Sequence, residues 1–181
     1  ENKDDSSSNP FINRAIEGRY APASTFKLVS AYGAISSGMI DPDVFLPDGG
    51  TYQLMNCVGD DCTKSNAGGK AHGPVDMAKA LAVSSDVYFY RIGDRFYWEK
   101  DKWGDGLQSA ARSFGYGAKS GVDLPGEVAG TVPDAAWRER LYNAMTPEEQ
   151  KVGSPEWKNY DSVFLAIGQG DMLATPLQIV N

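Results

Sequence analysis

The stretch 20–35, YAPASTFKLVSAYGAI, constrains the fold more than any other part of the chain. Its apolar residues recur at spacings of three and four, which predicts a helix with one wide apolar stripe. Pro22 suits the first turn of this helix, because its missing N–H would have no partner there. Gly38 is the predicted end, since glycine accepts the left-handed conformation just past a helix. The stripe consists of Phe26, Leu28, Val29, Ala31, Tyr32 and Ile35.

Ser24 and Lys27 lie three residues apart near the start of this helix, a spacing that places their side chains on one face. A serine hydroxyl becomes a strong nucleophile when a base takes its proton. A lysine can be that base only when it is neutral, and burial or a nearby positive charge favours the neutral form. The helix N-terminus also offers N–H groups to an oxyanion. The plainer alternative is that Ser24 caps the helix and Lys27 is a surface lysine. Because S-x-x-K is frequent by chance, the catalytic interpretation needs further motifs.

Composition narrows the class of protein. The apolar fraction of 41% and the charged fraction of 23% are typical of folded globular proteins. The net charge of −7 comes from 17 basic and 24 acidic residues without a basic cluster, which argues against binding to nucleic acid or to an anionic membrane surface. No stretch approaches the length of a transmembrane helix. A chain of 181 residues can bury one core or form part of a larger domain.

Cys57 and Cys62 are the only cysteines, and they lie in a stretch rich in Gly, Asp and Asn. They form either a small loop disulfide or two free thiols, and an oxidising compartment would favour the disulfide. A metal site would need more ligands than these cysteines and the single His72 supply. We therefore expect no metal, and we interpret His72 as a loop residue.

The remaining pattern predicts a mostly helical single domain. We find no internal repeat and no linker that would divide the chain. The polar run 1–9 is expected to be flexible, and 56–73 and 98–105 are expected to be irregular connections. Helices are predicted at 74–83, 86–97, 106–114 and 134–141, with proline-led starts at Thr146 and Thr175; short extended pieces are predicted at 51–54 and 121–124, and 162–167 is an apolar run before a Gly-Gln-Gly turn.

Two serines and a carboxylate, Ser84, Ser85 and Asp86, occupy the junction between two of these helices. Considered alone, one of the serines caps the second helix and Asp86 complements the helix dipole.

Three segments together carry a resemblance to a known family: Ser24-Thr25-Phe26-Lys27, Ser84-Ser85-Asp86 and the ending GQGDMLATPLQ. The chain resembles the transpeptidase domain of class B, monofunctional penicillin-binding proteins. S-x-x-K, S-D-N and K-T-G are the signature motifs of these enzymes and of related β-lactamases. The resemblance extends over NPFINRAIEGRYAPASTFK, GPVDMAKALAVSSDVYFY and FGYGAKSGVDLPGE, which occur in the family's order.

The resemblance implies a role for each residue. Ser24 would be the acylated nucleophile, Lys27 the base that takes its proton, and Ser84 the group that passes a proton to the leaving amine. Asp86 stands where most relatives carry asparagine, although some class B relatives carry aspartate. A charge at this position favours the protonated form of Lys27 unless a proton is shared. The chemistry would need neither a metal nor an organic cofactor.

The K-T-G motif is absent. Lys119-Ser120-Gly121 is similar in letters but falls in the middle connection, well before the Gly-Gln-Gly turn. We therefore expect residues 1–181 to be a partial domain that lacks the N-terminal strands and the K-T-G strand region. The expected fold is α/β of the α+β type, the β-lactamase and D,D-transpeptidase fold, represented here mostly by its helical part with short strands. Alone, it should not complete turnover.

The resemblance implies a D,D-transpeptidase that cross-links peptidoglycan stem peptides ending in D-Ala-D-Ala and is acylated by β-lactams. The parent protein would be membrane-anchored, face outward from the cytoplasmic membrane and work with cell-wall synthesis partners. That location would suit a Cys57–Cys62 disulfide.

Three alternatives compete with this interpretation. A β-lactamase or β-lactam sensor shares the STFK motif, but Val87-Tyr88-Phe89 after Asp86 is closer to transpeptidases. A scaffold fragment would lack the chemistry altogether. A Ser-His-Asp hydrolase is disfavoured, because His72 is the sole histidine and no nucleophile-elbow sequence is present.

Overall fold

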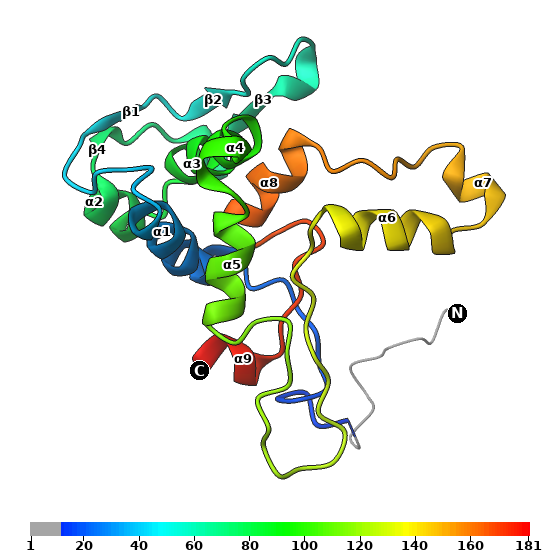
Figure 1. Cartoon of the computed structure of the whole chain (residues 1–181). Coiled ribbons are helices and arrows are strands. Elements are labelled where there is room, and N and C mark those ends of the chain that lie inside the picture. The colour runs from blue at the N-terminus through cyan, green and yellow to red at the C-terminus, as the bar shows by residue number, and fades with distance from the viewer. Residues whose placement is uncertain (1–11) are drawn as a thin grey trace, which may run out of the picture.

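Helices dominate the part of the chain described by the computed structural model, residues 12–181; the run 1–9, predicted to be flexible, lies outside it (Figure 1). The helices are α1 (Lys27–Ser36), α2 (Met77–Ala82), α3 (Asp86–Trp98), α4 (Lys100–Trp103), α5 (Gly106–Ser113), α6 (Ala135–Ala144), α7 (Pro147–Gln150), α8 (Asn159–Ala166) and α9 (Pro176–Val180). The strands are β1 (Leu46–Asp48), β2 (Thr51–Gln53), β3 (Thr63–Ser65) and β4 (Gly73–Val75). The predicted mixture of helices with short strands is confirmed.

The strands form two antiparallel pairs in the segment 37–76 between α1 and α2, which we call the excursion. β1 pairs with β4, with Leu46 opposite Val75, and β2 pairs with β3, with Tyr52 opposite Lys64. A Cys57–Cys62 disulfide closes the tip of the β2–β3 hairpin. The prediction of an irregular loop over 56–73 was therefore wrong at β3, which pairing with β2 stabilises and the composition of the segment itself does not indicate.

The core is built around α3, which crosses α8 closely. Val87, Tyr88, Phe89 and Ile92 of α3 are all buried, as are Val163 and Leu165 of α8. Gly93 allows the approach, because a Cβ at this position would lie 2.5 Å from the Ser162 carbonyl oxygen. The helix that carries Asp86 at its first position is thereby fixed against the middle of the core.

The helix α1 differs from its prediction in two ways. A 3₁₀ turn, Ala23–Phe26, precedes it, so the α-helix begins at Lys27 rather than beside Pro22. The apolar residues of the predicted stripe, which include Phe26 of the 3₁₀ turn, also divide between two faces. Phe26, Val29, Ala31 and Ala34 are buried, whereas Leu28, Tyr32 and Ile35 are exposed, Leu28 by 64%. The predicted single stripe is therefore only half covered.

Three further boundaries correct the sequence-based expectations. The helix predicted from Pro74 begins at Met77, because β4 takes up the first residues and Asp76 caps the helix through the Lys79 N–H. The connection 98–105 contains α4, and the apolar run 162–167 forms the end of α8 together with its C-cap residue, Ile167. No strand forms at 121–124, where bends and turns occur instead.

The predicted helix starts at Thr146 and Thr175 are confirmed. In each case the threonine hydroxyl accepts the N–H of the residue three positions later, Glu149 or Gln178. The side chain of that residue in turn accepts the threonine N–H, which forms a reciprocal capping box.

Replacing Gly93 with alanine is expected to lower the free energy of unfolding by about 1–3 kcal/mol, because the methyl group would collide with the α8 backbone. This loss should outweigh the gain in helix propensity of about 1 kcal/mol. Urea unfolding monitored by circular dichroism measures the change. Gly49→Ala is the matched control, because a Cβ added there would extend into open space. Equal stability of the two variants would contradict the packing argument.

Glu99 at the end of α3 should make stability sensitive to acid. Hydrogen bonds from Arg95 and then from Trp103 lower the pKa of Glu99 to about 2. A carboxylate with a lowered pKa stabilises the fold at neutral pH, and this contribution is lost as the pH falls towards 2. Glu99→Gln should therefore have a lower free energy of unfolding than the unsubstituted chain at pH 7. This difference in free energy should shrink below pH 4.5. A difference that stays constant between pH 7 and pH 3 in urea unfolding would refute this assignment.

Candidate active site

Ser24 is an exposed residue of the 3₁₀ turn that leads into α1. The preceding residue, Ala23, has a φ of +50° and donates its N–H to the Gly168 carbonyl at 2.8 Å. A Cβ at Gly168 would collide with the Ala23 carbonyl and with Phe26, so only glycine permits this approach. The Gly-Gln-Gly turn that follows α8 therefore supports the turn that carries Ser24.

Lys27 is the first residue of α1 and is almost completely buried, with 1% of its surface exposed. Its Nζ donates to the Ser84 carbonyl at 2.9 Å, to the Ser84 Oγ at 3.0 Å and to the Asp86 Oδ1 at 2.6 Å. All three acceptors belong to the junction between α2 and α3. The Lys27 side chain thus connects the first motif, residues 24–27, to the second motif, residues 84–86.

Ser84 lies between the lysine and the first serine. Its Oγ, which accepts from Lys27, also lies 3.0 Å from the Ser24 Oγ, to which it donates. A hydroxyl rotates freely between donating and accepting, so this chain can move a proton in either direction. The Ser84 backbone has a φ of +54°, which is uncommon for a residue other than glycine. Such a conformation persists only where the surrounding structure holds it.

The buried charge of Lys27 is compensated locally. The Asp86 carboxylate, 19% exposed, forms an ion pair with it, and the Phe89 ring lies 5.7 Å from the ammonium. A buried charge without a partner would cost several kcal/mol. The structure therefore brings together all four residues that the sequence singled out: Ser24, Lys27, Ser84 and Asp86.

Other candidates lie outside this group. The Ser120 N–H and hydroxyl both bond to Glu127 within their own loop, and these bonds, the hydroxyl first, lower the pKa of Glu127. Lys119-Ser120-Gly121 therefore belongs to a separate loop contact. His72 contributes its backbone N–H to the Asp48 carbonyl, in keeping with a loop residue. Within residues 12–181, no group of three His, Cys, Asp or Glu side chains could hold a metal ion.

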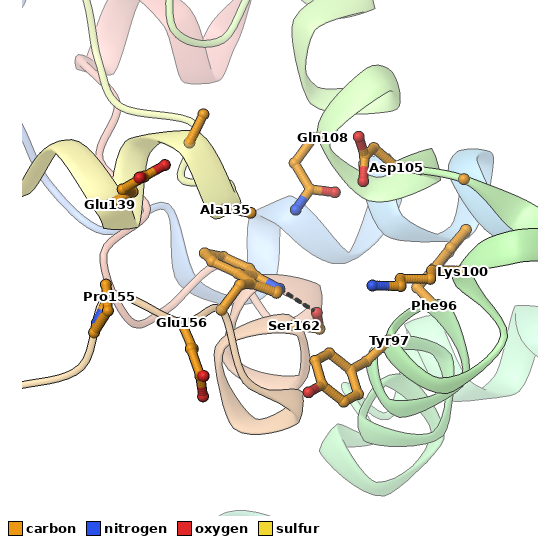
Figure 2. A pocket seen from close by; sticks show the side chains of 13 residues that line it. Phe96, Tyr97, Lys100, Asp105, Gln108, Ala135, Glu139, Pro155, Glu156 and Ser162 are labelled. Atoms are coloured by element: carbon orange, nitrogen blue, oxygen red, sulfur yellow. Dashed lines mark hydrogen bonds between the residues drawn. The ribbon is translucent and has the colours of Figure 1, made fainter.

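A cavity of about 610 Å³ lies away from these four residues, between α3, α5, α6 and the segment before α8 (Figure 2). Trp157 lines this cavity and donates its indole N–H to the Ser162 hydroxyl at 2.8 Å. Lys100, Asp105, Gln108 and Glu139 also line it, and Ser24 is not among its lining residues. Ser24 itself is on the open surface rather than inside a closed pocket.

Asp48 and Asn66 also support the site, although the sequence analysis did not single them out. Asp48 accepts a hydrogen bond from the Ser85 hydroxyl, and the Asn66 side-chain amide donates to Asp48. Both lie in stretches rich in glycine that predict only turns. No local signal distinguishes them.

An exposed serine linked through the hydroxyl of a second serine to a buried lysine is an arrangement suited to serine acyl transfer. Comparisons with known proteins agree with this class. The sequence profile described as "Penicillin binding protein transpeptidase domain" matches residues 1–181. The chain therefore belongs to the penicillin-binding protein transpeptidase family, and its relatives are of the class B type.

Named relatives and solved structures are similar over nearly the whole chain. The peptidoglycan D,D-transpeptidase MrdA of Acinetobacter baumannii is 32% identical over 97% of the chain and 23% of its own length. Its Escherichia coli counterpart is 31% identical over 94% and 24%. The crystal structure of Pseudomonas aeruginosa PBP2 in complex with WCK 5153 has a TM-score of 0.78 and 31% identity, covering 97% of this chain and 35% of that one. The chain thus spans about a quarter of the length of the curated relatives.

The ion pair between Lys27 and Asp86 can be tested by replacing each of the two residues. Asp86→Ala should lower the free energy of unfolding by about 3–5 kcal/mol, because it leaves a buried ammonium without its carboxylate. Lys27→Met should cost less, since the partly exposed Asp86 can turn to water. The double variant should be more stable than the sum of the single losses predicts. Urea unfolding of the three variants gives the coupling, and strictly additive losses would contradict the ion pair.

Proposed function

We propose that the chain is part of a D,D-transpeptidase that cross-links peptidoglycan stem peptides through an ester on Ser24. The hydrogen-bond chain Lys27–Ser84–Ser24 carries this proposal, because it connects a nucleophile to a buried amine through a hydroxyl that can relay a proton. The relatives named peptidoglycan D,D-transpeptidase supply the substrate class.

In this mechanism the Ser24 Oγ attacks the carbonyl carbon of the penultimate D-alanine of a donor stem peptide. Lys27 first passes a proton to Asp86 across their 2.6 Å contact, and the resulting neutral amine then takes the Ser24 proton through the Ser84 hydroxyl. When the bond to the terminal D-alanine breaks, Ser84 delivers a proton to the leaving nitrogen. The amine of a second stem peptide then attacks the ester, forms the cross-link and restores the Ser24 hydroxyl. A β-lactam would acylate Ser24 by the same first step.

We further propose that the complete catalytic cleft needs a K-T-G strand region in addition to residues 1–181. The exposed apolar face of α1, formed by Leu28, Tyr32 and Ile35, supports this proposal, since a sheet packed there would cover it. The small share of each relative that the chain matches points the same way. In the family, this strand helps bind the substrate carboxylate and contributes an oxyanion donor.

The proposed setting is the outer face of the cytoplasmic membrane, where the parent protein would be anchored. None of the helices within residues 12–181 is long and apolar enough to cross a membrane. Cell-wall synthesis partners are proposed from a Helicobacter pylori relative solved as a complex between PBP2 and MreC, which is 30% identical with a TM-score of 0.78. The Cys57–Cys62 disulfide suits an oxidising compartment.

Intact-mass measurement after incubation with benzylpenicillin tests the proposal. A polypeptide that extends through the K-T-G strand region should gain the mass of one penicillin, and its Ser24→Ala variant should gain none. Residues 1–181 alone should be labelled far more slowly. The adduct should persist for many minutes after free drug is removed, whereas a β-lactamase would lose it quickly.

The controls separate the alternatives. If the folded extended protein gains no mass, it is a scaffold and the transpeptidase proposal fails. If it turns over penicillin repeatedly without a lasting adduct, it is a hydrolase. Labelling that survives in Ser24→Ala would place the nucleophile at another residue.

A further inference from the structure

Three buried polar side chains, Asp48, Asn66 and Ser85, meet beneath the second motif. They come from β1, from the loop after β3 and from the residue that caps α3. The proposed chemistry uses none of them directly. Buried polar groups carry a desolvation cost unless they are hydrogen-bonded, so their partners indicate what they hold.

Two of these side chains bind the first turn of α3. The Ser85 Oγ accepts the Tyr88 N–H at 3.0 Å, and the Asn66 Oδ1 accepts the Val87 N–H at 2.9 Å. The first N–H groups of a helix have no partner within the helix, so these contacts fix where α3 begins. Asn66 also donates to the Lys70 carbonyl at 2.7 Å, which ties its own loop in place.

Asp48 joins the other two. Its carboxylate accepts from the Ser85 Oγ at 2.6 Å, from the Asn66 Nδ2 at 2.8 and 2.9 Å, and from the Gly50 N–H at 2.9 Å. Burial acts to raise the pKa of Asp48, but the hydrogen bonds from Ser85, Asn66 and Gly50 outweigh it and hold the pKa below its ordinary value. The carboxylate is thus a fully engaged acceptor at the centre of the group.

The segment above this group needs to be held. Ser84 has a φ of +54°, and the three hydrogen bonds of the Lys27 ammonium go to Ser84 and Asp86. Ser85 lies between these two residues. A shift of residues 84–86 would therefore separate Lys27 from its acceptors and Ser84 from Ser24.

We propose that Asp48, Asn66 and Ser85 form a positioning network that fixes residues 84–86 for proton transfer between Ser24 and Lys27. The inference rests on the proposed function, and it assigns to the excursion between α1 and α2 a part in the acylation step. A polar network in which every member is bonded specifies one geometry more strictly than apolar packing does. Small displacements matter here, because a misplacement of about 1 Å can cost roughly a hundredfold in rate.

The test compares Ser85→Ala and Asn66→Ala with Gln53→Ala. Gln53 is the matched control, since its hydrogen bond with Thr63 lies in the same excursion but on the exposed β2–β3 pair. Two readouts are needed. The first is the rate constant of Ser24 acylation by benzylpenicillin at saturating drug, measured separately from the drug's dissociation constant in the extended protein. The second is the Lys27 side-chain 13Cε and 15Nζ resonances of folded chain 1–181, which need no reaction.

Ser85→Ala and Asn66→Ala are expected to lower the acylation rate constant by about ten- to a hundredfold, with less change in the dissociation constant. The Lys27 resonances should move in both variants and stay in place in Gln53→Ala. Folded variants with unchanged resonances and an unchanged rate constant would overturn the proposal, as would equal effects in the control. If the unmodified protein is not acylated, the proposed function fails, and the Lys27 resonances still decide whether the network positions residues 84–86.

Discussion

The site depends on one constraint: the ammonium group of Lys27 is buried and must find its acceptors inside the protein. Ser84 and Asp86 supply three of them, so the start of α1 and the start of α3 are fixed to each other. The crossing of α3 with α8 at Gly93 then fixes α3 against the core. The close contact of Gly168 with Ala23 completes the arrangement, because it sets the turn that carries Ser24. Helix packing thereby sets the distances between Ser24, Ser84 and Lys27.

Much of this arrangement could be predicted from the sequence. Proline and threonine indicated the starts of α7 and α9, because these caps use residues adjacent in the chain. The three segments quoted for the resemblance predicted the family, and the four residues proposed for chemistry lie together in the structure. Such success reflects local rules: helix periodicity and capping act over a few residues, and a family's motifs keep their order.

What could not be predicted depends on contacts between distant residues. Asp48 and Asn66 stand in glycine-rich turns, and only folding brings them to Ser85. The β3 strand exists because β2 pairs with it, and the exposed face of α1 has the same apolar pattern as the buried one. The 3₁₀ turn before Lys27 is joined to the distant Gly168 by the hydrogen bond that Ala23 donates. The sequence lists these residues but does not indicate which of them come into contact.

The hydrogen bond between Ala23 and Gly168 also bears on the order in which contacts form during folding and synthesis. Its partners are 145 residues apart (168 − 23), so it closes one of the longest loops in the chain. Contacts at such separations form late, because the entropy of the intervening chain must be given up first. During synthesis, the turn that carries Ser24 leaves the ribosome before the Gly-Gln-Gly segment does. Ser24 is thus made well before the glycine that supports its turn, so a chain that ends between them carries an unsupported serine.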